Sequence, residues 1–229
     1  NCLEVMTGAI LPKGTNTVIR YEDVVTKEGV AHIQVEDIRA QQNVHHQGSD
    51  RKKNSIIVKA GKQISPAEIG IAATVGKAQL EVSQLPKTII LSTGDELVEI
   101  EEIPLPHQIR RSNVHRLRTT LLQFGIQADT AHLQDDWEEI LEKLGAMLKS
   151  YDVVLLSGGV SKGKFDLLPK ALEELGVQKH FHKIQQRPGK PMWFGTAPAG
   201  ATIFALPGNP VSSFMCMQRY FIPWMRKSL

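Results

Sequence analysis

From residue 86 onward, short apolar runs alternate with longer stretches in which apolar side chains recur every three or four positions. The apolar runs predict buried strands at residues 88–92, 128–133, 153–157, 179–186, 192–194 and 202–206. The longer stretches predict helices at residues 113–125, 136–149 and 167–175, and a last helix that begins at Pro210. Strands and helices in alternation are typical of an α/β fold, in which helices cover a sheet.

Polar residues stand where these helices are expected to begin. Asn113 is predicted to cap the helix at residues 113–125, and Asn209 is predicted to cap the last helix. Within the helix at 113–125, one face is expected to pack against the sheet through Val114, Leu117, Leu121 and Leu122.

The first 85 residues follow a different pattern, which is β-like and rich in loops. Residues 18–25 and 30–35 predict a hairpin that turns near Gly29. The one helical stretch, residues 66–73, has Ser65 as its expected cap and Gly76 as its stop. We therefore expect a partial β-rich domain with a connecting segment at residues 1–85 and an α/β domain at residues 86–229. The absence of an initiator Met suggests an excerpt of a longer protein.

Composition excludes several classes of protein. Hydrophobic residues make up 41% of the chain and charged residues 22%, as in ordinary soluble globular proteins. A net charge of +3 is too small to indicate a nucleic-acid partner, and no apolar run is long enough to predict a membrane helix. Cys2 and Cys216 lack metal-binding spacing, and Cys216 is expected to be buried and inert. A reducing cytoplasm fits this cysteine usage.

A glycine-rich segment, residues 158–166, follows the predicted strand at 153–157 and precedes a helix. Such a turn presents backbone N–H groups at a helix N-terminus, where anions and above all phosphates bind. Gly163 and Lys164 nearly complete a phosphate-loop pattern, but Phe165 stands where Ser or Thr would hold magnesium. This departure counts against a P-loop nucleotide hydrolase. The alternative interpretation of this segment is a tight turn that binds no ligand.

Carboxylates follow three of the predicted strands: Asp95 and Glu96 follow the first, Asp135 and Asp136 the second, and Asp166 the glycine turn. The carboxyl ends of parallel strands meet at one edge of a sheet, where ligands bind. Gathered carboxylates repel one another unless a cation lies between them, so magnesium binding or general acid–base chemistry is expected. Helix capping is the alternative, and for Asp136 we favour it.

Two further segments are suited to an oxyanion. Lys183, Arg187 and Lys190 surround a Pro-Gly turn that is able to hold them as a clamp, although idle surface cations are an equal alternative. In the turn at residues 207–212, the Ser212 hydroxyl and free N–H groups at the helix start favour an oxyanion, with an ordinary capped helix as the alternative. The histidines, including His45 and His46, lack metal-binding spacing.

Six segments in the same order resemble the molybdopterin molybdenumtransferases, the family of MoeA and the gephyrin E domain. They are residues 4–9, 47–50, 92–97, 157–161 with Asp166, 187–191 and 206–212. The resemblance implies a three-layer molybdopterin-binding domain with a mostly parallel sheet, preceded by an incomplete β-rich domain. It also implies the reaction: adenylylated molybdopterin (molybdopterin-AMP) and molybdate are the substrates, Mg²⁺ is present, AMP is released and molybdenum is inserted at the dithiolene.

The resemblance also implies roles for individual residues. The catalytic set it implies is Glu96, Asp135, Asp166, Lys183 and Arg187, with Glu96 and Asp166 as metal ligands and with Thr7 and Asp50 contributed by the β-rich domain, often across a homodimer interface. The pterin–nucleotide pocket it implies consists of Ser157, Gly158, Gly159, Val160 and Ser161. The molybdate pocket it implies consists of Lys190, Pro207, Asn209, Pro210 and Ser212.

This sequence departs from the family pattern in several places, and two other functions are alternatives to the one that the resemblance implies. The family usually has Lys where Arg187 stands, so charge is kept but a proton-donating lysine is lost. The family also continues before Asn1 and after Leu229, and the missing C-terminal domain normally gives an arginine to the molybdate pocket. This excerpt is therefore expected to bind substrate but to be inactive by itself. An adenylyltransferase-like enzyme would carry Thr-Gly where Val160 and Ser161 stand. A scaffold or anchoring module is the alternative of another class, and contact with the adenylyltransferase that supplies the substrate is an expected partnership.

Overall fold

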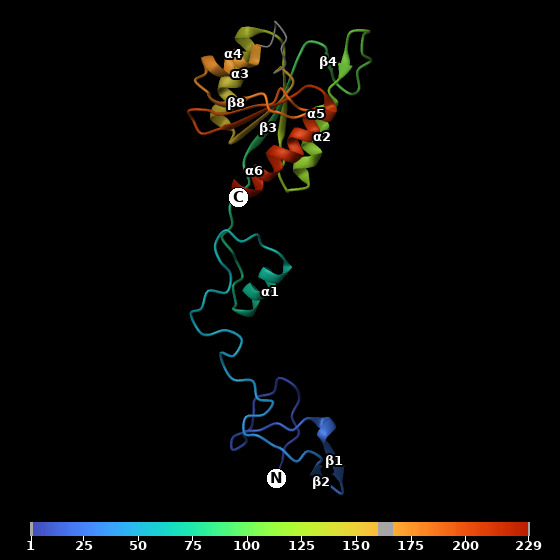
Figure 1. Cartoon of the computed structure of the whole chain (residues 1–229), viewed down its shortest axis with the longest axis vertical. Helices are drawn as coiled ribbons and strands as arrows, with labels where there is room; N and C mark the ends of the chain where they lie inside the picture. Colours follow the sequence, from blue (N-terminus) through green and yellow to red (C-terminus); the bar gives the residue numbers. More distant parts are fainter. Residues whose placement is uncertain (1, 160–166, 229) are drawn as a thin grey trace. The chain divides into compact units, whose positions relative to one another are not determined.

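The computed structural model describes residues 2–159 and 167–228. Contacts between residues divide the chain into two units, Asn1–Gln79 and Leu80–Leu229. The second unit holds the large sheet and most of the helices (Figure 1). The sheet and its flanking helices therefore belong to one continuous segment of the chain.

The first unit contains a short hairpin and one helix among loops. The hairpin turns at Glu28 and Gly29, whose φ angles of 49° and 75° lie in the left-handed region that tight hairpin turns require. The first strand is shorter than the predicted residues 18–25, because a 3₁₀ turn occupies part of that segment. The elements are the 3₁₀ turn Tyr21–Asp23, β1 (Val24–Lys27), β2 (Val30–Ile33) and α1 (Pro66–Thr74).

Helix α1 begins and ends where the sequence indicated. The Ser65 hydroxyl accepts a hydrogen bond from the Ala67 amide at 3.2 Å, and the Ser65 amide donates to Glu68 Oε2 at 2.9 Å. These reciprocal bonds form a capping box. The Ser65 hydroxyl, which donates to Glu68 Oε2, and then the Ser65 amide lower the pKa of the Glu68 carboxyl. Gly76, with φ of 76°, follows the last turn. The predicted cap and stop are confirmed.

The second unit is built on a six-stranded sheet with the order β6-β3-β7-β10-β9-β8. The first four strands in this order run parallel to one another, and β9 runs antiparallel to both of its neighbours. The predicted α/β class with a mostly parallel sheet is confirmed. The strands are β3 (Thr88–Thr93), β6 (Asp129–Leu133), β7 (Val153–Ser157), β8 (Gln178–His182), β9 (Trp193–Thr196) and β10 (Thr202–Leu206).

The three central strands are buried on both faces, which explains their continuous apolar sequences. Along β3, Ile89 and Leu91 pack into one core while Ile90 packs into the other. Strands β7 and β10 alternate in the same way. Both faces of the sheet therefore need a covering layer of helices.

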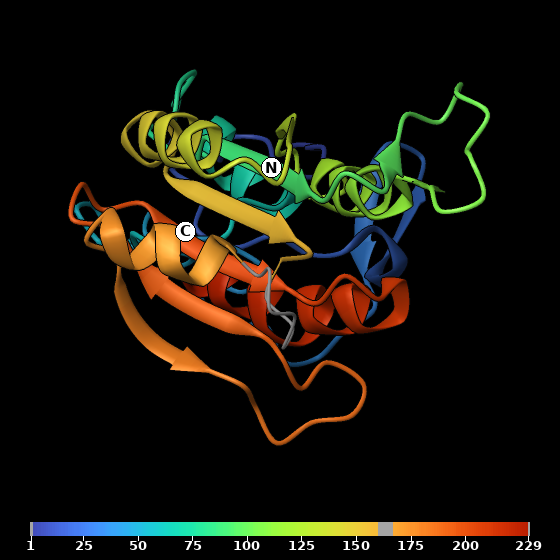
Figure 2. The same ribbon diagram turned by 90° about the horizontal axis from the view of Figure 1, so that it is seen from above.

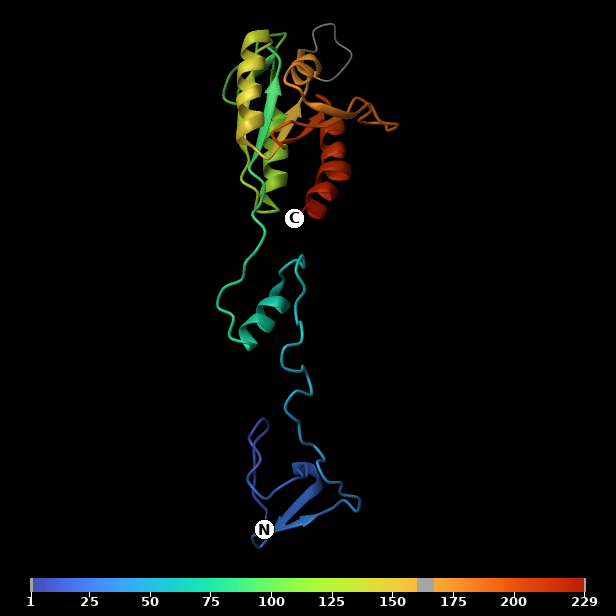
Figure 3. The ribbon, with the colours of Figure 1, turned by 90° about the vertical axis from the view of Figure 1, so that its left-hand side faces the viewer.

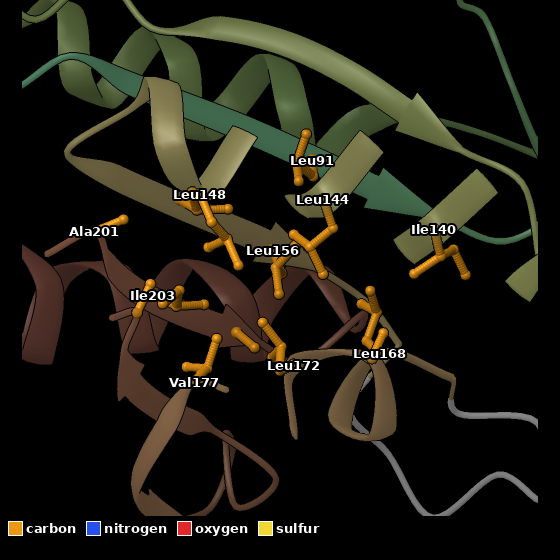
Figure 4. Packing of buried hydrophobic residues seen from close by; sticks show 14 of the residues in the cluster. Leu91, Ile140, Leu144, Leu148, Leu156, Leu168, Leu172, Val177, Ala201 and Ile203 are labelled. Carbon is orange, nitrogen blue, oxygen red and sulfur yellow. The ribbon is translucent and has the colours of Figure 1, made fainter. Parts of the chain in front are cut away.

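Helices cover both faces of the sheet. Figure 3 shows α3 (Trp137–Ser150) on one side of β3 and α2 (Ser112–Leu122) on the other. The α3 side, which also includes α4 (Leu167–Glu174), is closed by leucines and isoleucines that interdigitate with those of the sheet (Figure 4). The α2 side is completed by α5 (Pro210–Cys216), the π-helical turn Met217–Phe221 and α6 (Ile222–Ser228).

Helix α2 differs from the sequence expectation at both ends. Its cap position is held by Arg111, and the side chain of that residue makes no capping hydrogen bond. Asn113, the predicted cap, lies inside the first turn and donates to the Gly208 carbonyl instead. At the other end Leu122 is 48% exposed, whereas Leu121 is fully buried. Only Leu121 of this pair contributes to the core.

The strand predicted at residues 179–186 ends early. Strand β8 stops at His182, because Lys183 adopts a φ of +72° that no strand contains. The chain then forms a loop that includes a cis peptide bond between Arg187 and Pro188 before β9 begins. The two cations Lys183 and Arg187 therefore lie on a loop rather than on a strand face.

Cys216 is buried beneath this loop, and its thiol donates to the Gly189 carbonyl across 3.6 Å. Burial raises the pKa of the Cys216 thiol to about 11. The thiolate is therefore scarce at neutral pH, which agrees with the prediction of a buried, inert side chain. Along the residues that the structure describes, every helix is too short or too polar to cross a membrane.

Candidate functional site

The turns after β3, β7 and β10 meet at one cavity of about 200 Å³. Strands β3 and β7 run side by side in the same direction, so their carboxyl ends reach the same edge of the sheet (Figure 2). The cavity is lined by Ser92, Thr93, Glu96, Leu97, Ile109, Arg110, Arg111, Ser112, Asn113, Val114, Ser157, Gly158, Gly208 and Pro210. Edges of this kind are where open α/β sheets bind ligands.

Glycines allow these turns to touch. The Gly158 amide donates to the Leu206 carbonyl at 3.1 Å, which joins the turn after β7 to the end of β10. Gly158 has a φ of 102°, and a Cβ atom added at Gly208 would lie 3.6 Å from the Gly158 Cα. At Gly159, with φ of 68°, an added Cβ would lie 2.8 Å from Thr93 Oγ1. A side chain at Gly159 would therefore clash and strain the backbone.

The start of α2 supplies residues that sequence reasoning missed. The Asn113 side-chain amide donates to the Gly208 carbonyl at 2.7 Å and so ties α2 to the turn after β10. Its Oδ1 atom is buried and has no hydrogen-bond partner among the described residues. Arg111 is buried in the cavity wall. Only the polar character of this helix start hinted at such a role.

Carboxylates gather beside the cavity, as their positions after β3 and β6 indicated. Asp95 Oδ1 accepts a hydrogen bond from the Asp135 amide at 3.1 Å, and Glu96 lines the cavity. Burial raises the pKa of the Asp135 carboxyl, and the negative charges of Asp95 and Glu96 raise it further. Three acidic side chains thus share one electrostatic environment. Asp136 caps α3 by accepting from the Glu139 amide at 2.8 Å, as we favoured.

A magnesium ion would need further ligands. Within residues 2–159 and 167–228, no three His, Cys, Asp or Glu side chains are arranged to hold a metal ion. Mg²⁺ is usually bound by one or two carboxylates together with waters and substrate phosphates. The predicted ligand Asp166 and the predicted pocket residues Val160 and Ser161 lie outside the described residues.

The predicted cationic clamp lies on the loop between β8 and β9. Lys183, Arg187 and Lys190 are exposed. None of the three is among the described residues that line the cavity. The loop is fixed at its base, because the Ile184 amide donates to the Lys190 carbonyl at 2.8 Å. The Tyr220 hydroxyl also anchors it by donating to Gln186 Oε1 at 2.7 Å. These two hydrogen bonds therefore fix the loop that contains the three cations.

The turn after β10 corrects one expectation. Asn209 Oδ1 accepts from the amides of Val211 and Ser212, at 3.0 and 3.2 Å. The Ser212 hydroxyl is also directed at Asn209 Oδ1, at 3.3 Å, and Ser212 is buried. The expectation of free N–H groups and an outward hydroxyl is therefore wrong for these two residues, because the cap uses them. Pro207 is buried, and Pro210 lines the cavity.

Thr7 and Asp50 belong to the first unit, and their roles stay predictions. Thr7 is exposed. Asp50 Oδ2 lies 3.3 Å from His45 Nε2, a salt bridge when the imidazole is protonated. Asp50 and His45 line a separate cavity of about 420 Å³ in the first unit, whereas Thr7 is not among the described residues that line it.

Comparison with known proteins decides the family. Residues 89–227 match the family described as "Probable molybdopterin binding domain", and residues 1–76 match the "MoeA N-terminal region (domain I and II)". The chain belongs to the MoeA family. A MoeA structure from Pyrococcus horikosii superimposes with a TM-score of 0.77 at 29% identity, over 97% of this chain and 55% of that one.

Curated members of the MoeA family carry the name molybdopterin molybdenumtransferase. The protein from Synechocystis is 42% identical over 228 residues, which cover 96% of this chain and 57% of that protein. The protein from Synechococcus elongatus is 37% identical over 225 residues, covering 96% of this chain and 55% of that protein. The chain thus spans a little over half the length of these MoeA relatives.

Proposed function

We propose that the protein is a molybdopterin molybdenumtransferase, which takes adenylylated molybdopterin and molybdate and releases AMP. The proposal rests on the cavity that the turns after β3, β7 and β10 share, with Glu96 in its wall. Membership of the MoeA family supplies the substrate class. Molybdate is a substrate in this scheme rather than a resident cofactor.

The chemistry required is the hydrolysis of a phosphoanhydride. A water oxygen attacks the adenylyl phosphorus, the bond from that phosphorus to the bridging oxygen breaks, and molybdopterin leaves with the bridging oxygen on its own phosphate while AMP forms. Glu96 is suited to accept the proton of the attacking water, because it is the one carboxylate among the described residues that line the cavity. The backbone amides of the α2 N-terminus are suited to hold phosphate oxygens, because no side chain caps them. Lys183, Arg187 and Lys190 are proposed to receive the oxyanions.

Finer parts of the proposal rest on family resemblance. Mg²⁺ held by Glu96 and Asp166 would stabilise charge on the phosphates. Chelation with EDTA tests this role: AMP release is expected to stop and to return when Mg²⁺ is added.

We also propose a homodimer in which Thr7 and Asp50 reach the partner's site. We propose contact with the adenylyltransferase that supplies the substrate, and a cytoplasmic location. Light scattering of the purified protein tests the dimer.

The experiment uses protein expressed from the complete gene, supplied with adenylylated molybdopterin and molybdate. We expect AMP and molybdenum-loaded molybdopterin to appear in equal amounts. A Gly159→Val variant is the matched inactive control, because its added side chain clashes with Thr93 and Leu168. The proposal is refuted if the wild-type protein releases no AMP, or if it instead consumes ATP to adenylylate molybdopterin.

A further inference from the structure

Arg111 occupies a position that local helix physics disfavours. It is the cap residue of the 11-residue helix α2, yet it makes no capping hydrogen bond. A positive charge at a helix N-terminus also opposes the helix dipole. Its side chain is nevertheless 9% exposed and stands in the cavity wall. Interactions away from the helix must therefore hold it there.

Its guanidinium joins three elements that are distant in sequence. Nε donates to Ser92 Oγ on β3 at 2.9 Å, and Nη2 donates to the Ala131 carbonyl on β6 at 3.3 Å. Nη1 forms an ion pair with Glu99 Oε1. A buried guanidinium that loses one partner is left with an uncompensated charge, so such a set acts as a unit.

Glu99 lies just after a short strand, and the cavity residue Glu96 lies just before it. This strand, β4 (Leu97–Val98), pairs in parallel with β5 (Ile109–Arg110) over only two residues each. Two backbone bonds flank the pair: the Ile109 amide donates to the Glu96 carbonyl at 2.8 Å, and the Arg111 amide donates to the Val98 carbonyl at 3.0 Å. A two-residue ladder opens readily without further support.

We propose that Arg111 is a positioning residue, which fixes the segment from residue 94 to residue 99 through Glu99 and thereby holds Glu96 at the cavity. The Ser92 and Ala131 bonds anchor the guanidinium to the rigid sheet, and the Glu99 bond transmits that rigidity to the segment. Arg111 acts on Glu96 through Glu99. The proposal deepens the proposed function, since Glu96 is the proton acceptor assigned there.

The first test measures structure and does not depend on activity. In protein from the complete gene, Arg111→Met is expected to speed amide hydrogen exchange in peptides covering residues 94–110 by roughly tenfold, because the segment loses its anchor. Exchange in β7 should stay unchanged, and so should all exchange in Arg118→Met, a control on the exposed side of α2. Unchanged exchange at residues 94–110, or an equal increase throughout the protein, would overturn the proposal.

The second test measures AMP release. Arg111→Met and Glu99→Gln are each expected to lower kcat by roughly tenfold to a hundredfold, since small misplacements of a reacting group have such effects, while KM stays within threefold. The double variant should be no worse than either single variant, because both act on the same contact. Additive losses, or a rise in KM with kcat kept, would contradict positioning. If the wild-type protein releases no AMP, the proposed function fails while the exchange experiment still decides the role of Arg111.

Discussion

Replacing Glu96 with glutamine is expected to slow AMP release by about two to three orders of magnitude. Glutamine keeps the size of the side chain but cannot accept a proton, and general base catalysis is commonly worth about 10²–10⁴ in rate. Substrate affinity should change by less than about threefold, because the cavity wall keeps its shape. Steady-state kinetics of AMP release, with protein from the complete gene, measure both quantities.

Glu101→Gln is the matched control for this experiment. Glu101 lies in the same connection between β4 and β5, is exposed, and is not among the described residues that line the cavity. Its replacement should leave the rate unchanged. If Glu96→Gln retained a rate within threefold of the wild type, Glu96 would not be the base, whatever the role of the cavity.

The second large effect concerns stability. Leu121→Ala is expected to lower the free energy of unfolding by about 2–5 kcal/mol, because Leu121 is fully buried against the sheet and its truncation leaves a cavity. Urea unfolding followed by tryptophan fluorescence reports this change. The three tryptophans, Trp137, Trp193 and Trp224, all lie in the second unit, so the signal is specific to the unit that contains α2.

The adjacent Leu122 provides an internal control. It has the same chemistry and the same helix but is 48% exposed, so Leu122→Ala should cost less than about 1 kcal/mol. Equal losses for the two variants would mean that the packing of α2 against the sheet differs from the structure described above.

The central strands could be predicted because burial on both faces leaves a clear signature in the sequence. Strands β3, β7 and β10 are continuous apolar runs and lie where the pattern indicated. Strand β8 carried a weaker signal, because it is an edge strand with mostly exposed side chains. Nothing in its alternation marked the left-handed conformation of Lys183 that ends it.

The site was predictable where it depended on strand ends and not where it depended on tertiary bonds. Glu96 and Gly158 follow buried strands, and both line the cavity. Asn113 is a suitable cap by local rules, but a bond to Gly208, which is distant in sequence, determines its role. Arg111 is similar, because its partners come from three separate elements.

The cap at Asn209 shows how two local features of a helix start can exclude each other. A capping side chain and free N–H groups at the same helix start are alternatives, since the cap accepts hydrogen bonds from those groups. The prediction of the cap was correct, and it already excluded free amides at residues 211 and 212. Anion binding at this turn must therefore use other groups.

The most direct measurement is a crystal structure of the protein from its complete gene, soaked with AMP, Mg²⁺ and molybdate. The account predicts that AMP binds in the cavity bordered by Thr93, Gly158 and Gly208, with its phosphate near Glu96 and with molybdate beside the Lys190 loop. Well-ordered AMP at a different location, with this cavity empty at saturating AMP, would contradict the assignment of the three turns as one ligand site.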